Sequence, residues 1–94
     1  MRAIKLHRKH IRSIKLQATS VLSEIHRGEI KIWKIRFHQI GAENLLRVDF
    51  ATTAAPGQFF SRFFNLEKYD RWWDVWLKGD LLVVANQKER AISQ

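Results

Sequence analysis

The clearest hydrophobic pattern in the chain has the period of a helix. In residues 10–27, apolar side chains recur mainly at steps of three and four. These steps gather them on one side of a helix with about 3.6 residues per turn. The apolar residues are Ile11, Ile14, Ala18, Val21, Leu22 and Ile25. Gly28 follows where a left-handed C-terminal cap is expected, so the pattern predicts one amphipathic helix that ends near this glycine.

Residues 1–7 fit two structures. Ile4 and Leu6 alternate with more polar neighbours, which is typical of a short edge strand. The same residues also fit an N-terminal extension of the helix, and both interpretations stay open at this point.

After Gly28 the period changes to two, which is the period of a strand. Residues 33–38 and 46–50 flank a turn at 41–44 and predict a β-hairpin. Its apolar side consists of Trp33, Ile35, Phe37, Leu46, Val48 and Phe50. Its other side consists of Lys34, Arg36, His38, Arg47 and Asp49. We therefore expect one face of the sheet to meet helices and the other to meet water.

The second half of the chain contains the aromatic residues with the least certain period. Beyond Pro56 and Gly57, the apolar residues at 59, 60, 63, 64 and 66 suit a second helix on the same sheet. Residues 71–77 extend this helix in one interpretation, with Gly79 as its cap. In the other, which we favour, they form a strand that turns at Gly79 and Asp80 into a further strand at 81–85.

These elements predict a small α+β domain that spans residues 1–94. We expect an antiparallel sheet of about four strands, covered on one face by two helices. A chain of 94 residues can bury one modest core. The predicted core consists of Ile11, Ile14, Ala18, Val21, Leu22, Ile25, Trp33, Ile35, Phe37, Leu46, Val48, Phe50, Phe59 and Phe63.

The chain is strongly basic, and the excess lies at its N-terminus. Seventeen Lys and Arg against nine Asp and Glu give a net charge of +8, which attracts polyanions or acidic protein surfaces. No acidic residue precedes Glu24. If the helix extends back through the first residues, one cationic stripe forms that suits backbone phosphates. It consists of Lys5, Arg8, Arg12 and Lys15.

The polar side of the hairpin is a second basic surface, formed by Lys34, Arg36 and Arg47. Proteins that bind RNA or single-stranded DNA use such open sheets, together with exposed aromatic side chains. Trp72 and Trp76 are the aromatic residues that the favoured hairpin would expose. The first hypothesis is therefore a non-catalytic nucleic-acid-binding protein, with the choice between DNA and RNA left open.

A protein-binding role is the alternative. Four Trp and six Phe are more than a small core hides, so we expect an exposed aromatic patch. An adaptor or inhibitor would dock this patch, around Trp72 and Trp76, onto an acidic partner protein. A homodimer paired through a sheet edge would also cover surplus aromatic residues.

A third hypothesis is a metal-independent ribonuclease. His38 beside Arg36 and Lys34 suits proton transfer next to a cationic phosphate clamp. Residues 81–90 resemble, over about ten residues, the last strand of the small basic mRNA-cleaving toxins of bacterial toxin–antitoxin pairs. The resemblance implies an RNA-cleaving activity. The proton shuttle of this hypothesis is His38, chosen for its place beside Arg36 and Lys34.

Other chemistries lack residues to carry them. The absence of cysteine excludes disulfides, thiolate nucleophiles and Cys-based metal sites. His7 and His10 have no third ligand near them in sequence, and no glycine-rich phosphate loop occurs, so we expect no cofactor and no metal. No apolar run approaches roughly 20 residues and no signal-peptide order is visible, so we expect a cytoplasmic protein without a membrane span. The acid-free, cationic first 20 residues also fit a mitochondrial transit peptide, which is the alternative for localisation.

Overall fold

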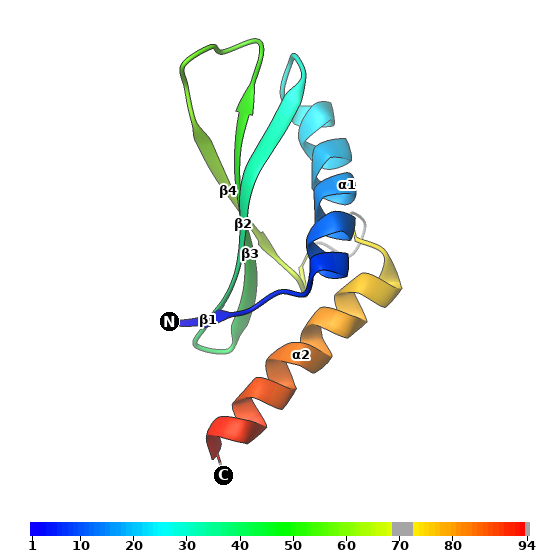
Figure 1. Cartoon of the computed structure of the whole chain (residues 1–94), viewed down its shortest axis with the longest axis vertical. Coiled ribbons are helices and arrows are strands. Elements are labelled where there is room, and N and C mark those ends of the chain that lie inside the picture. The colour runs from blue at the N-terminus through cyan, green and yellow to red at the C-terminus, as the bar shows by residue number, and fades with distance from the viewer. Residues whose placement is uncertain (69–72, 94) are drawn as a thin grey trace.

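Four antiparallel strands form one sheet, and the helices lie on one side of it (Figure 1). The computed structural model describes residues 1–68 and 73–93, with side chains as far as Asn86. Its elements, in chain order, are β1 (Arg2–Ile4), α1 (Arg8–Ile25), β2 (Ile30–Ile40), β3 (Glu43–Thr52), β4 (Phe60–Asn65) and α2 (Val75–Ser93). The strands lie in the sheet in the order β1-β2-β3-β4. The predicted α+β class is confirmed.

The helix predicted in residues 10–27 is confirmed as α1. Its residues Ile14, Ala18 and Leu22 are fully buried against the sheet. The imidazole Nδ1 of His7 accepts a hydrogen bond of 3.2 Å from the backbone N–H of Lys9 and caps the first turn. Because the chain before His7 forms β1, residues 1–7 are a strand and a connection, not an extension of the helix. The prediction that Ile25 belongs to the core is wrong, since this last helical residue is 46% exposed.

Gly28 reverses the chain between α1 and β2. It has a φ of +84°, in the left-handed region that favours glycine, but it lies beyond the helix cap at His26. A Cβ at this position would lie 2.6 Å from the hydroxyl oxygen of Thr53 and 2.7 Å from the backbone nitrogen of Ala54. The turn therefore needs glycine both for its φ and for the space.

The predicted hairpin is confirmed as β2 and β3, with a bulge that changes which residues face inward. Ile32 pairs with Phe50 and Lys34 with Asp49, so Trp33 is the extra residue. The prediction that Trp33 belongs to the core is wrong: its side chain is 56% exposed.

The helix predicted from residue 59 onward is wrong, because residues 60–65 form β4. Phe60 pairs with Phe50, and Phe64 pairs with Leu46, so both rings point to the helix side. Phe59 and Phe63, which we expected in the core, are 73% and 49% exposed. The strand period of two places alternate aromatic residues on opposite faces, where a helix would have gathered them.

The prediction of a C-terminal hairpin is also wrong, because residues 75–93 form the helix α2. Leu77, Leu81 and Ala85 recur every four residues and are fully buried. Before the helix, Trp73 is buried with its ring edge-on to Phe64 at 5.4 Å between ring centroids. Residues 81–90, which resembled a toxin strand, are helical, and Trp72 lies outside the described residues.

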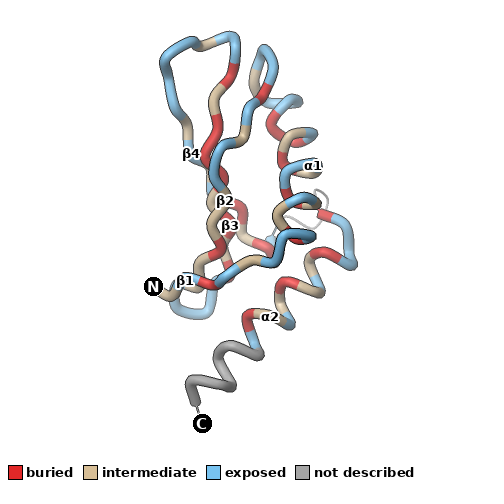
Figure 2. Tube along the Cα trace, in the orientation of Figure 1, coloured by how far each residue is buried: buried red, intermediate tan, exposed pale blue. Residues whose placement is uncertain are grey.

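Polar contacts hold α2 against α1. Gln17 accepts the backbone N–H of Asp74 at 2.7 Å and donates to its carboxylate at 3.1 Å. Six residues further along the chain, within α2, Asp80 bonds to the buried imidazole of His10. Figure 2 shows the buried positions of both helices, and Figure 1 shows α2 running past the end of the sheet. None of the helices, over the residues described, has the length and apolar character needed to cross a membrane.

Candidate nucleic-acid interface

The sheet face opposite the helices, called here the open face, presents polar side chains in rows that cross the strands. β2, β3 and β4 each contribute one residue to a row, because the pairing is in register across all of them. The rows are Lys34–Asp49–Ser61, Arg36–Arg47–Phe63 and His38–Leu45–Asn65. The three cations predicted on the sheet, Lys34, Arg36 and Arg47, are therefore together on this face.

Asp49 is the centre of the open face and is almost completely covered, with 1% of its surface exposed. Its Oδ1 accepts hydrogen bonds from the Ser61 hydroxyl at 2.6 Å and from the Arg47 Nε at 2.9 Å. The Arg36 guanidinium lies 3.9 Å from the other carboxylate oxygen. A single carboxylate thus holds the arginines that face each other across β2 and β3.

These contacts decide the ionisation of Asp49. Burial by itself would raise the pKa of this carboxyl. The hydrogen bonds from Ser61 and Arg47, together with the charges of Arg47 and Arg36, outweigh burial and bring the pKa below its ordinary 3.8. Asp49 is therefore ionised at neutral pH and neutralises part of the positive charge on the open face.

Exposed aromatic rings lie among the cations of the open face. The Arg47 guanidinium lies over the ring of Phe63, 5.9 Å from its centroid. At the bulge, Trp33 meets Phe59 edge-on, with ring centroids 6.1 Å apart. Ala51 on β3 lies between β2, which carries Trp33, and the start of β4, which Phe59 directly precedes, and its small side chain leaves room for the two rings to meet. Solvent reaches Trp33, Phe59 and Phe63.

A groove, called here the edge groove, lies along β2 beside the open face. β1 pairs only with the end of β2, at Phe37, His38 and Gln39, so the earlier part of β2 has no neighbouring strand on that side among the described residues. The groove has a volume of about 430 Å³. Its lining includes Lys5, Leu6, Ile11, Lys34, Ile35 and Arg36. Lys5 thus lies in the connection before α1 and joins the cations of the sheet.

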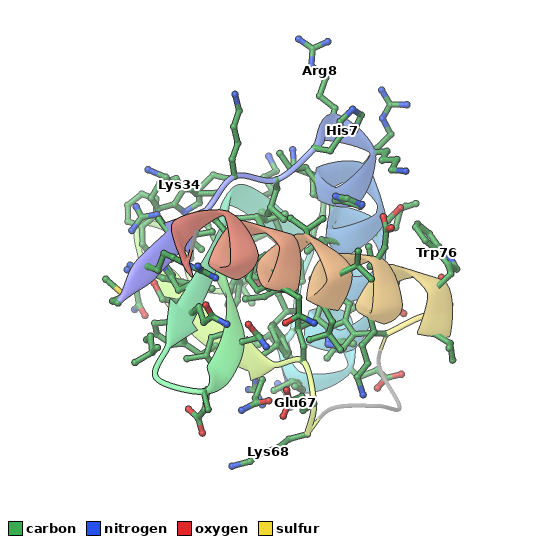
Figure 3. All side chains as sticks on the ribbon, turned by 90° about the horizontal axis from the view of Figure 1, so that it is seen from below. His7, Arg8, Lys34, Glu67, Lys68 and Trp76 are labelled. Carbon is green, nitrogen blue, oxygen red and sulfur yellow. The ribbon has the colours of Figure 1, made fainter. Side chains whose placement is uncertain are left out.

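The remaining cations of the predicted stripe lie on α1. Arg8, Arg12 and Lys15, called here the helix stripe, are exposed and line a second hollow of about 200 Å³ with Ile11. Ile11 also lines the edge groove, so the two hollows adjoin. In Figure 3, Arg8 and Lys34 lie toward one side of the molecule, and Lys68 lies at the opposite side. The two basic surfaces predicted separately are neighbours in space.

Trp76, one of the two tryptophans predicted for an aromatic patch, does not lie on the open face. Trp76 lies on α2 and is 54% exposed. Figure 3 places it on the helix side of the molecule, away from Lys34. Gly79 and Val83 follow at steps of three and four on the same helix, and Val83 is 51% exposed. Trp76 therefore belongs to an apolar stripe on α2 and not to the open face.

Sequence reasoning missed the aromatic half of the open face. The apolar residues Ile30 and Ile32 alternate in one phase, and Ile35 and Phe37 alternate in the other. That change of phase was the available signal for a bulge at Trp33. For Phe59 and Phe63 the sequence carries no comparable signal, because pairs of adjacent aromatic residues fit a helix and a strand equally well.

The histidines and acids that the structure describes do not gather in one place. Nowhere in the part of the chain that the structure describes do three His, Asp or Glu side chains come together as a metal site would require. His38 lies on the open face two residues from Arg36 and is half-buried. Its buried Nδ1 has no hydrogen-bond partner among the described residues. Among the described residues, the structure thus shows no hydrogen-bonded partner that would orient the His38 ring for proton transfer.

Comparisons with protein-family models, with curated proteins and with solved structures gave no match for this chain. Its function is therefore inferred from the open face, the edge groove and the helix stripe.

Proposed function

We propose that this protein is a non-catalytic nucleic-acid-binding domain whose interface is the open face, extended by the edge groove to the helix stripe. The observation that carries the proposal is the mixture of exposed rings and guanidinium groups on the uncovered face. Arg47 lies over Phe63 at 5.9 Å, and Phe63 remains 49% exposed. Rings that stack on bases, beside cations that contact phosphates, are the features that nucleic-acid-binding sheets use.

The arrangement of charge supports an anionic ligand. Arg36 and Arg47 are direct cross-strand partners, and like charges in that position destabilise a sheet. Asp49 compensates one of the two positive charges. A phosphate near the remaining charge would relieve the repulsion, so the face gains stability from the ligand that it attracts.

The adjoining cations lengthen this surface. Lys5 reaches it through the edge groove, and Arg8, Arg12 and Lys15 continue it along α1. A backbone of several phosphates can contact such a surface in succession, and each contact releases counterions. The affinity should therefore fall steeply as the salt concentration rises.

The test is fluorescence anisotropy of labelled single-stranded DNA, duplex DNA and RNA, titrated with the protein at about 50 and about 200 mM salt. We expect saturable binding that weakens with salt. Lys34→Gln should reduce the slope of log affinity against log salt by about one, because it removes one phosphate contact. Lys68→Gln is the matched control, since Figure 3 shows Lys68 on the opposite side of the molecule. Absence of saturable binding at the lower salt, or equal effects of the two substitutions, would overturn the proposal.

A second candidate is binding to an acidic protein through α2. The observation that favours it is the apolar stripe of Trp76, Gly79 and Val83 on a protein of net charge +8. Exposed tryptophan is a frequent anchor of protein interfaces. In this case Trp76→Ala would abolish capture of the acidic partner from nuclease-treated extract, and Lys34→Gln would leave the capture unchanged.

A further inference from the structure

We infer, building on the proposed function, that the ligand is single-stranded, with unpaired bases stacked on Trp33, Phe59 and Phe63 and with its phosphates beside Lys34 and Arg36. The juxtaposition that assigns this ligand is a cluster of solvent-exposed rings on the same sheet face as the paired arginines. The edge groove then leads the strand toward Lys5.

Exposed rings distinguish a single strand from a duplex. Trp33 is 56% exposed and Phe59 is 73% exposed, although the chain has an inner face that receives Phe50, Phe60 and Phe64. Bases of a duplex are stacked on each other, and only their edges face the grooves. Unpaired bases expose their flat faces, so only a single strand can cover these rings by stacking.

The distance between Phe59 and Phe63 along the open face is long enough for more than one base to stack. Phe59 and Phe63 are four residues apart, which corresponds to roughly 13 Å at the rise of an extended strand. Between them lies the row of Lys34, Asp49 and Ser61. A strand that stacks one base at each end therefore passes its backbone across the row that carries Lys34.

The contacts of the rings leave surface free for this stacking. Trp33 and Phe59 meet edge-on, with their ring planes at 80°, and both rings remain more than half exposed to solvent. The Arg47 guanidinium lies over one face of the Phe63 ring. A base that stacks beside this pair also meets the guanidinium, which adds a cation–π contribution. Stacking of this kind is tolerant of sequence, so we expect little discrimination among bases.

The helix stripe is the feature that a duplex would use instead. Arg8, Arg12 and Lys15 are exposed on one helix, without an aromatic residue beside them in the hollow that they line. Contacts from that stripe would be to phosphates alone and would serve either form of nucleic acid. Substitutions at the rings and at the cations therefore separate the two modes of binding.

The experiment compares a single strand of about 12 nucleotides with a duplex of the same sequence, each titrated with the 94-residue protein. A 2-aminopurine base in the strand reports stacking through quenching of its fluorescence. We expect tighter binding of the single strand and quenching on binding. Trp33→Ala and Phe63→Ala should each weaken the single-strand affinity by about 5- to 150-fold, the range measured for loss of one base stack. Trp76→Ala is the matched control and should change neither signal.

Each outcome decides between the two proposals. Equal affinity for both forms, with no effect of Trp33→Ala and a reduced salt slope in Lys34→Gln, would overturn the single-strand inference and leave the proposed function standing. Binding to neither form would overturn both. If Phe63→Ala unfolds the protein, Phe63→Leu keeps the volume without the ring, and Trp33→Phe keeps a ring at the bulge. The inference then requires weaker binding in Phe63→Leu and near-normal binding in Trp33→Phe.

Discussion

At the scale of single residues, Asp49 organises the candidate interface. It alternates in β3 with the buried Val48 and Phe50 and therefore points to the side away from the helices. A carboxylate that is 1% exposed needs strong partners, and Arg47 and Ser61 provide hydrogen bonds to it. Its second oxygen has only the more distant charge of Arg36, at 3.9 Å. Asp49 thus fixes the directions of the side chains that the ligand is proposed to meet.

Substitution of Asp49 should destabilise the fold. Asp49→Asn removes the negative charge between Arg36 and Arg47 and weakens the hydrogen bonds to it, which should cost about 2 kcal/mol. Urea unfolding followed by circular dichroism measures this change. Ser13→Ala, in α1 and remote from Asp49 in sequence, serves as a control and should change the stability by less than about 0.5 kcal/mol. A stability of Asp49→Asn equal to that of the wild type would show that the network does not hold the face together.

The carboxylates Asp49 and Asp80 predict a dependence of the stability on pH. Hydrogen bonding to His10 lowers the pKa of Asp80, against a smaller effect of desolvation, and the contacts described above lower that of Asp49. A carboxyl whose pKa is lower in the folded protein stabilises the fold above its unfolded pKa, and this stabilisation is lost as the pH falls through the folded pKa. We therefore expect the urea concentration at the unfolding midpoint to decrease as the pH is lowered from about 5 to about 2. The difference between wild type and Asp49→Asn should shrink toward zero over the same interval, and a constant difference would contradict the assignment.

At the scale of elements, the sequence was most informative where a period was long and uniform. The helix in residues 10–27 has several turns of one apolar face, and the hairpin has two strands with alternation in both. The aromatic run from residue 59 is short, and its adjacent pairs satisfy both periods. Pairing with β3 makes this run a strand and not a helix, because Phe60 and Phe64 can then pack on Phe50 and Leu46. That information is tertiary and is not present in the run itself.

The alternation in β4 makes a sharp prediction for neighbouring residues. Phe64→Ala should cost about 3 to 5 kcal/mol, because it opens a cavity among fully buried side chains. Phe63→Ala should cost less than about 1 kcal/mol, since it loses an exposed ring and a cation–π contact. Thermal and urea unfolding of the two variants measure the contrast. Similar losses would mean that both rings face the core, as the helix interpretation required.

A substitution at Gly79 tests whether this residue lies in a helix, as observed, or in the turn of the hairpin predicted from sequence. It is exposed, has ordinary negative φ, and a Cβ there would meet nothing within 4 Å. Gly79→Ala should therefore stabilise α2 by about 1 kcal/mol, which is the difference in helix propensity. A differential scanning calorimetry scan should show a melting temperature higher by about 4 to 8 °C for a domain of this size. A lower melting temperature would indicate that Gly79 lies in a turn.

At the scale of the whole molecule, charge was predictable and the form of the interface was not. Cations at Lys5, Arg8 and Lys34 could be assigned from sequence because long charged side chains lie at the surface in almost any fold. The meeting of Lys5 and Lys34 around the edge groove depends on β1, which pairs Ile4 with Phe37 and brings Lys5 beside β2. Trp33 is exposed because one bulge shifts the alternation of side chains along β2 by one residue. Association of two copies through a sheet edge stays a prediction.

The most direct test of the nucleic-acid interface is a titration of the ¹⁵N-labelled protein with single-stranded oligonucleotide, followed by NMR spectra of the backbone amides. The proposed function predicts that the largest shift changes lie in residues 33–38, 45–51 and 59–65, together with residues 5–12, where the edge groove adjoins the helix stripe. The amides of α2 from Val75 to Val83 should be nearly unchanged. Shift changes concentrated on α2, with the sheet unaffected, would contradict the account and place the binding surface at Trp76.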